Sequence, residues 1–82
     1  MQQVRLIARF QRMPSTVIRR FFYVPEAREL TIEFVTGRRY RYFDVPSHQV
    51  EAFRAAFSKG TYFNRHIRDE YRFRELSRTT GD

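Results

Sequence analysis

Three segments in the first half of the chain have the composition and alternation of β-strands. They are residues 17–24, 30–35 and 39–43, each rich in β-branched and aromatic side chains. Turn-forming residues follow the first segment at 25–28, and Thr36 and Gly37 follow the second. Short connections of this kind join neighbouring antiparallel strands, so the pattern predicts a three-stranded antiparallel meander.

After Pro46 the apolar spacing changes to that of a helix. Val50, Phe53 and Phe57 recur every three or four residues. This spacing predicts an amphipathic helix with Pro46 in its first turn, where a missing backbone N–H does no harm.

A break separates this helix from a second one. Gly60 is available as a left-handed stop for the first helix, and Ser58 is available as a cap. The second short helix is predicted from apolar residues at i, i+4 and i+8, namely Phe63, Ile67 and Tyr71. Three strands with two helices packed on one sheet face make an α+β fold.

The sequence pattern predicts the secondary structure of the two chain ends less clearly. Residues 1–12 fit a strand, in which Val4, Leu6 and Phe10 share one side, and equally a helix with an arginine-rich face. A fourth strand at the N-terminus therefore stays an open alternative. We expect an N-terminal extension over residues 1–12, one domain over 13–76 and a polar tail over 77–82.

The loop around Gly37 decides which way Tyr40 and Tyr42 face. The apolar side of the second strand consists of its even-numbered residues, namely Leu30, Ile32 and Phe34. A two-residue turn would point both tyrosines outward, but it would need a positive φ at the β-branched Thr36. A three-residue loop with Gly37 in the left-handed conformation has no such cost. We therefore predict that both tyrosines belong to the core.

The amino-acid composition favours some classes of function and excludes others. The chain of 82 residues has a net charge of +7, and Lys59 is the single lysine among its 16 basic residues. Arginine binds phosphate with two parallel hydrogen bonds and stacks on flat rings, so such a surface suits RNA or DNA. The absence of cysteine excludes disulfides and thiolate metal sites. No apolar run reaches the length of a membrane span, and we expect a cytoplasmic protein with no membrane partner.

The candidate nucleic-acid contacts are basic residues on the outward sheet face, at the turn, between the helices and on the second helix. They are Arg38, Arg39, Arg41, Lys59, Arg65 and Arg68. Phe21 and Phe43 are candidates to share the arginine face. The alternative is a solvated surface on which arginines pair with Glu33, Glu51 and Asp69.

Other conspicuous residues are expected to be structural. They are Gly37, Tyr40, Tyr42, Pro46, Ser58, Gly60 and Asn64. His48 and His66 lie near several carboxylates, but their spacing matches no metal site or nucleophile motif. We predict no catalytic residue, no metal and no cofactor, and an enzyme would require Ser58, Asn64 and a histidine to meet in one pocket.

Most of the chain resembles the KTSC domain, a module found at the C-terminus of some lysyl-tRNA synthetases and as a stand-alone bacterial protein. The similarity lies in the order and spacing of short motifs: Ser15, Ile18, Tyr23, Leu30-x-Ile32-x-Phe34-x-x-Gly37, Tyr40-x-Tyr42, Val45-Pro46, Ala56-x-Ser58-Lys59-Gly60-x-Tyr62-Phe63-Asn64, Ile67 and Tyr71. The sequence departs from the family pattern at Phe22 and Val24, where a small and an acidic residue are more usual.

The resemblance implies an association with tRNA synthetases. Combined with the arginine content, it predicts a small non-enzymatic module that binds RNA, either tRNA or a single strand, with little reading of sequence. The alternative is a protein-interaction module that docks an acidic partner or pairs through a strand edge. The sequence indicates neither the cognate RNA nor the oligomeric state.

Overall fold

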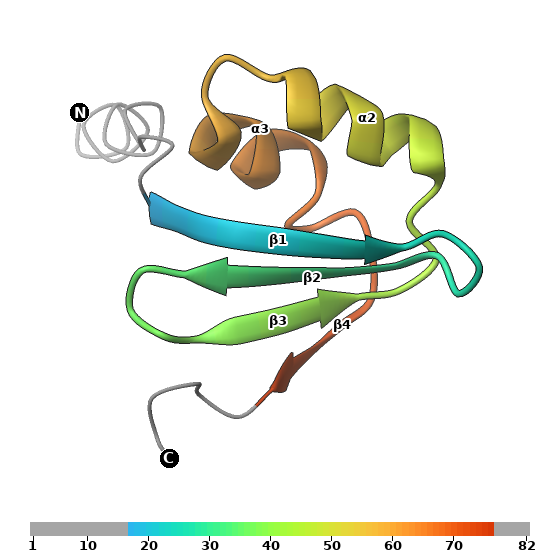
Figure 1. Ribbon diagram of the computed structural model, residues 1–82, viewed down its shortest axis with the longest axis horizontal. Helices are drawn as coiled ribbons and strands as arrows, with labels where there is room; N and C mark the ends of the chain where they lie inside the picture. The colour runs from blue at the N-terminus through green and yellow to red at the C-terminus, as the bar shows by residue number, and fades with distance from the viewer. Residues whose placement is uncertain (1–16, 77–82) are drawn as a thin grey trace, which may run out of the picture.

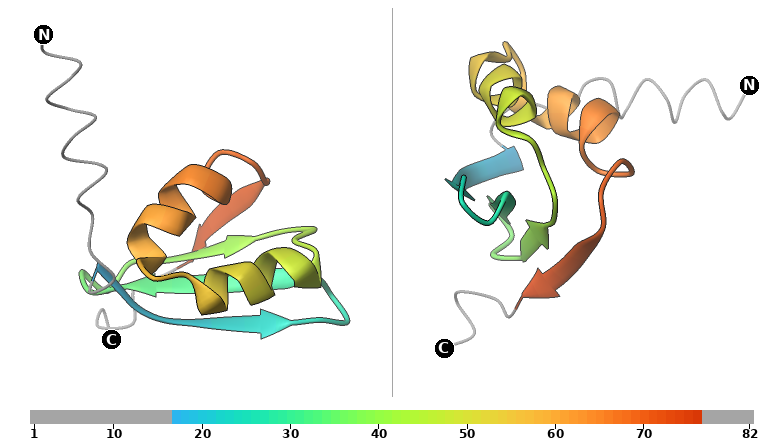
Figure 2. Two further views of the ribbon diagram at one scale, coloured as in Figure 1. Left: turned by 90° about the horizontal axis from the view of Figure 1, so that it is seen from above. Right: turned by 90° about the vertical axis from the view of Figure 1, so that its right-hand side faces the viewer.

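The computed structural model describes residues 17–76, which form four strands and two helices (Figure 1). In chain order they are β1 (Ile18–Val24), β2 (Glu29–Phe34), β3 (Arg39–Tyr42), α2 (Ser47–Ala55), α3 (Lys59–His66) and β4 (Phe73–Leu76). The strands make one antiparallel sheet in the order β1-β2-β3-β4, and both helices lie on the same side of it (Figure 2). The predicted α+β fold is confirmed. Within residues 17–76, neither helix has the length and apolar character needed to cross a bilayer.

The helices divide the sheet into a covered face, which packs against them, and an open face on the other side. The predicted meander corresponds to β1, β2 and β3, each within two residues of its expected bounds. The expectations for residues 1–12 and 77–82 lie outside the described residues.

The fourth strand comes from the C-terminal part of the domain. The sequence pattern extends the second helix to Tyr71, but α3 ends at His66 and the chain turns back to pair β4 with β3. Phe43 N–H donates to the Arg72 carbonyl at 2.9 Å, where this pairing begins. Four residues are too few to show a strand period, and β4 owes its conformation to the free backbone groups at the edge of β3.

The loop between β2 and β3 contains three residues, as predicted. Phe34 N–H donates to the Arg38 carbonyl at 2.9 Å, and Gly37 has a φ of 96°. Tyr40 is thereby paired with Ile32, and Tyr42 with Leu30. Both tyrosines lie on the covered face, and Tyr42 is only 3% exposed.

A β-bulge in β1 is a second feature that the sequence pattern does not reveal. The register shifts between Ile18 and Arg20, so Ile18 and Phe21 both face the helices although one position number is even and the other odd. The Phe21 ring packs 4.7 Å from that of Phe53 in α2. The expectation that Phe21 shares the arginine face is wrong, and Phe22 takes that place.

The core lies between the covered face and the two helices. Its fully buried side chains include Leu30, Ile32, Val50, Phe53 and Ile67. Phe57 was expected in the apolar stripe of the first helix, but this helix ends at Ala55 and the Phe57 side chain is fully exposed. The periodicity of the stripe continues in the sequence after the helix itself has stopped.

The residues at the ends of the two helices were predicted correctly in part. Ser58 caps α3, since its side-chain oxygen accepts a hydrogen bond from Thr61 N–H at 3.3 Å. Pro46 is the N-cap residue of α2, and its carbonyl accepts from the N–H of Val50 at 3.3 Å. Gly60 is not a left-handed stop: it lies buried in the first turn of α3, and its φ is not positive.

Candidate nucleic-acid interface

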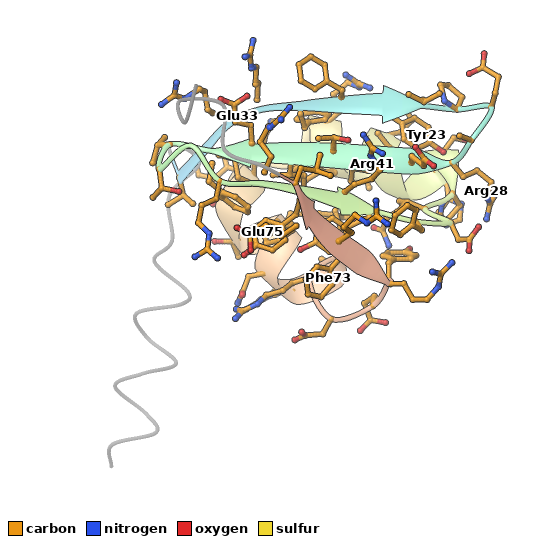
Figure 3. All side chains as sticks on the ribbon, turned by 90° about the horizontal axis from the view of Figure 1, so that it is seen from below. Tyr23, Arg28, Glu33, Arg41, Phe73 and Glu75 are labelled. Carbon is orange, nitrogen blue, oxygen red and sulfur yellow. The ribbon has the colours of Figure 1, made fainter. Side chains whose placement is uncertain are left out.

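The open face carries the side chains that alternate with those of the core. Figure 3 views the sheet from this side, with Glu33 and Arg41 in front of the sheet and the helices behind it. The strand register assigns to this face Arg20, Phe22, Val24, Glu29, Thr31, Glu33, Arg39, Arg41, Arg74 and Leu76. Four arginines and two carboxylates give the face an excess of positive charge.

One corner of the open face is neutralised by Glu33. This side chain is only 2% exposed, and its Oε1 accepts a hydrogen bond from Arg20 Nε at 2.9 Å. The Nε atom of Arg19 lies 3.9 Å from the second carboxylate oxygen. Glu33 was expected on the arginine face as a candidate partner of arginines, and the structure confirms this pairing. Its burial follows from its place on an inner strand, where long arginine side chains surround it.

The next row of the open face, toward β4, holds an excess of positive charge. Arg41 of β3 stands directly opposite Arg74 of β4 in the register. The nearest carboxylate to Arg41 is that of Glu29, with its Oε1 3.9 Å from Nε, and no carboxylate within residues 17–76 pairs with Arg74. Like charges directly across two strands destabilise a sheet. A bound anion between them would remove this repulsion.

An exposed aromatic ring accompanies these charges. Phe22 is 51% exposed on β1, and the guanidinium of Arg20 lies 5.5 Å from its ring centroid. Rings in this position are the platforms on which single-stranded bases stack. The bulge in β1 turns Phe22 outward, so the sequence pattern could not have identified it.

The predicted site residues do not form one surface. Arg39 and Arg41 lie on the open face. Lys59 and Arg65 belong to α3 and Arg68 follows it, which places all three on the covered side of the sheet. The Lys59 ammonium donates to the Ala56 carbonyl at 3.3 Å, in the loop between the helices.

Arg38 is held by a carboxylate of the edge strand. Its Nε and Nη2 atoms donate to the two oxygens of Glu75 at 2.8 and 3.0 Å. These hydrogen bonds and the negative charge of Glu75 raise the pKa of Arg38 above its ordinary value. The guanidinium also lies 5.8 Å from the Tyr40 ring, so Arg38 belongs to the covered side.

A second surface feature is a cleft on the covered side, between α3 and the strands β3 and β4. We call it the aromatic cleft, because it is lined by the rings of Phe34, Tyr40, Tyr42, Phe63 and Phe73. Its volume is about 680 Å³. Asn64, Arg68 and Asp69 form its polar wall, and the Asn64 Oδ1 atom accepts from Arg68 Nη1 at 2.6 Å.

The groups that an enzymatic site would need are spread apart. Asn64 lines the aromatic cleft, but neither Ser58 nor a histidine does. His66 packs against Tyr62, with 4.5 Å between ring centroids, and His48 is exposed on α2. Among residues 17–76 no group of three or more His, Asp or Glu side chains is arranged to hold a metal ion.

Comparison with known proteins identifies the fold family. The sequence model of the KTSC domain matches residues 14–71. The chain belongs to the KTSC domain family. The crystal structure of a KTSC domain protein from Yersinia pestis superposes with a TM-score of 0.71 and 32% sequence identity, covering 73% of this chain and 84% of that one.

Proteins of very different length match the same part of this chain. A lysine–tRNA ligase of Nostoc punctiforme is 42% identical over 63 residues, which are 77% of this chain and 11% of the ligase. An uncharacterized protein of Stutzerimonas stutzeri is 37% identical over 59 residues, covering 72% of this chain and 83% of that protein. This chain is therefore homologous to a small part of the ligase and to most of a much smaller protein.

Proposed function

We propose that this KTSC domain is a small RNA-binding module, that its ligand is tRNA or single-stranded RNA, and that it performs no catalytic step. The contact surface is the open face of the sheet. Arginines there neutralise phosphates, and Phe22 offers a ring for stacking.

The observation that carries the proposal is the Arg41–Arg74 pair. A sheet gains nothing in stability from two guanidinium groups directly across from each other, so the arrangement costs folding free energy. The same arrangement is favourable for binding, because a phosphate can accept hydrogen bonds from both groups.

The proposal that the ligand is tRNA is supported by the names of the relatives. The ligase of Nostoc punctiforme is named for a tRNA substrate, and a segment of it is 42% identical to this chain over 63 residues. A domain that holds tRNA near a ligase would need affinity for the phosphate backbone and little reading of sequence.

Binding to RNA is tested by fluorescence anisotropy across a salt series. The probes are an unmodified tRNA transcript, a single-stranded oligoribonucleotide and polyglutamate. The variant is Arg41→Gln with Arg74→Gln, and its matched control is Arg54→Gln with Arg65→Gln, which removes the same charge from the helices. We expect the first variant to bind RNA about tenfold more weakly with a salt slope smaller by about two, and the control to bind nearly as well as the wild type.

The outcomes separate the alternatives. Equal losses in the two variants would show that only net charge matters, and no binding of RNA at low salt would overturn the proposal. Tighter binding of polyglutamate than of RNA would instead favour docking of an acidic protein.

Arg39 is a poor residue for this test. It stands opposite the buried Glu33 in the register, so Arg39→Glu would bring two carboxylates together. The resulting repulsion would unfold the sheet and would be mistaken for a loss of binding.

A further inference from the structure

The aromatic cleft lies on the other side of the sheet from the proposed RNA surface. Its rings are packed edge to face or tilted, with centroids 5.5 Å apart for Phe34 and Phe63 and 5.4 Å apart for Tyr42 and Phe73. Phe73 is nevertheless 53% exposed, because β4 is the edge strand and α3 does not reach over it. A volume of about 680 Å³ falls within the range of about 300–1,000 Å³ that is usual for small-molecule sites.

Tyr42 has a buried side chain, only 3% exposed, whose hydroxyl keeps some access and has no hydrogen-bond partner among residues 17–76. Tyr23 and Tyr62 differ, since their hydroxyls donate to the Val45 carbonyl at 2.7 Å and to Gln49 Oε1. Among residues 17–76 every side-chain oxygen or nitrogen that is fully buried has a hydrogen-bond partner. The unpartnered Tyr42 oxygen is therefore not fully buried, and since Tyr42 lines the aromatic cleft, we infer that its oxygen is accessible from there.

The Tyr42 hydroxyl is a donor at neutral pH. Burial, the neighbouring Tyr40 and the carboxylate of Asp69 raise its pKa above the ordinary value, and the charge of Arg68 opposes them only in part. The hydroxyl therefore keeps its proton and presents it to whatever enters the cleft.

The polar wall supplies complementary groups. Asn64 Oδ1 is occupied by Arg68, which leaves the amide nitrogen as a donor. The carboxylate of Asp69 makes no ion pair within residues 17–76 and is an acceptor. A donor and an acceptor thus stand beside aromatic walls, with the guanidinium groups of Arg38 and Arg68 at the rim.

We propose that the aromatic cleft binds a single unstacked nucleobase, with its ring against the aromatic side chains and its polar edge on Tyr42, Asn64 and Asp69. A purely apolar ligand would leave these three polar groups unsatisfied, which costs binding free energy. A simple anion would be attracted by Arg38 and Arg68 but repelled by the carboxylate of Asp69, and it has no flat face to pack against the aromatic rings. A nucleobase has both a flat face for stacking and an edge of alternating donors and acceptors.

The source of the base is either a free nucleotide or a strand of RNA, and the second rests on the proposed function. Isotope-labelled full-length protein is titrated with each of the four nucleoside monophosphates, with a short single-stranded oligoribonucleotide and with inorganic phosphate. We expect a base-containing ligand to shift the backbone signals of Phe63 and Phe73 and the side-chain amide signal of Asn64.

The decisive variants are two tyrosines that each lose one oxygen. Tyr42→Phe is expected to bind the base about fivefold more weakly, the worth of one neutral hydrogen bond, and to be as stable as the wild type because its hydroxyl has no partner in the fold. Tyr23→Phe is expected to lose stability and to bind normally. The proposal is overturned if inorganic phosphate reproduces the shifts, if no ligand produces them, or if Tyr42→Phe binds as the wild type does.

The proposed function and this inference fail separately. Arg41→Gln with Arg74→Gln changes only the open face, so it should leave the binding of a nucleoside monophosphate in the cleft unaltered. Shifts with monophosphates would assign the site to free nucleotides, and shifts with the oligoribonucleotide alone would assign it to an RNA strand. Loss of cleft binding in that open-face variant would show that the cleft is not an independent site.

Discussion

The covered and open faces of the sheet are built from the same strands but differ in the side chains they carry and in how far these are exposed. On the covered face, neighbouring side chains are aromatic and pack together, as in the pair of Tyr40 and Tyr42, whose ring centroids are 6.5 Å apart. On the open face, neighbouring side chains are charged and partly exposed, as in the pair of Arg41 and Glu29. Alternation along each strand lets one residue serve the fold while the next one serves the surface.

The two faces also contribute unequally to stability. Burying a large aromatic side chain is worth several times as much as an exposed ion pair, whose value is about 0–1 kcal/mol. Charged residues can therefore change on the open face with little loss of folding free energy. The exception is Glu33, which is charged and yet buried.

The largest expected difference in stability is between two Phe→Ala substitutions, one under the covered face and one on the open face. Phe53→Ala removes a fully buried ring of α2 that packs against the covered face, and it should lower the free energy of unfolding by about 3–5 kcal/mol. Phe22→Ala removes a half-exposed ring and should cost about 1 kcal/mol or less. Urea denaturation followed by circular dichroism measures both values, and similar losses would show that the faces are not distinct.

Substitution of Glu33 tests whether a buried charge on the open face contributes to stability. Glu33→Gln leaves Arg19 and Arg20 without their buried carboxylate, so we expect a loss of about 1–3 kcal/mol in the free energy of unfolding. Glu29→Gln serves as the control, because its carboxylate is one-third exposed and 3.9 Å from Arg41, and it should change stability by about 0.5 kcal/mol or less. Both variants should bind RNA more tightly than the wild type, since each removes one negative charge from the open face.

Two tyrosines of the covered face should respond differently to loss of a hydroxyl. Tyr23→Phe breaks the hydrogen bond to the Val45 carbonyl and should cost about 0.5–1.5 kcal/mol of stability. Tyr42→Phe should cost nothing measurable. Thermal denaturation of the two variants side by side gives the answer, and an equal decrease in Tm would mean that the Tyr42 hydroxyl has a structural partner.

The smallest effect is a dependence of stability on alkaline pH. Because the pKa of Tyr42 is raised in the folded protein, the folded state holds this proton more tightly than the unfolded state. The contribution is complete below the unfolded pKa of about 10 and is lost as the pH rises toward the folded value. At about pH 10.5 the loss reaches at most about 0.8 kcal/mol.

The comparison is made with Tyr42→Phe by urea denaturation at about pH 9 and about pH 10.5. The wild type should lose more stability between the two conditions than the variant does. Identical losses would place the Tyr42 hydroxyl in solvent.

Local chemistry was sufficient to predict the central hairpin. A β-branched threonine before Gly37 disfavours a two-residue turn, and loop length then sets the parity of the whole third strand. The inward direction of Tyr40 and Tyr42 and the capping role of Ser58 followed from such short-range rules. The position of Phe57 did not, because the end of a helix depends on what the next segment packs against.

The candidate site was less predictable than the fold. Arg39 and Arg41 were placed correctly on one face by parity, but their partner Arg74 lies on a strand that has no periodic signal of its own. Lys59, Arg65 and Arg68 were grouped with them by charge alone, and charge carries no information about which side of the sheet a residue occupies.

The sequence by itself determined the three-stranded meander, the two helices and the family, since these rest on alternation, spacing and turn residues within short stretches of chain. Only the tertiary structure decided that a bulge exposes Phe22, that β4 brings Arg74 opposite Arg41, and that rings from three strands and a helix enclose a cleft around the Tyr42 hydroxyl. Each of these depends on contacts between residues distant in the chain, and such contacts form only once the sheet has assembled.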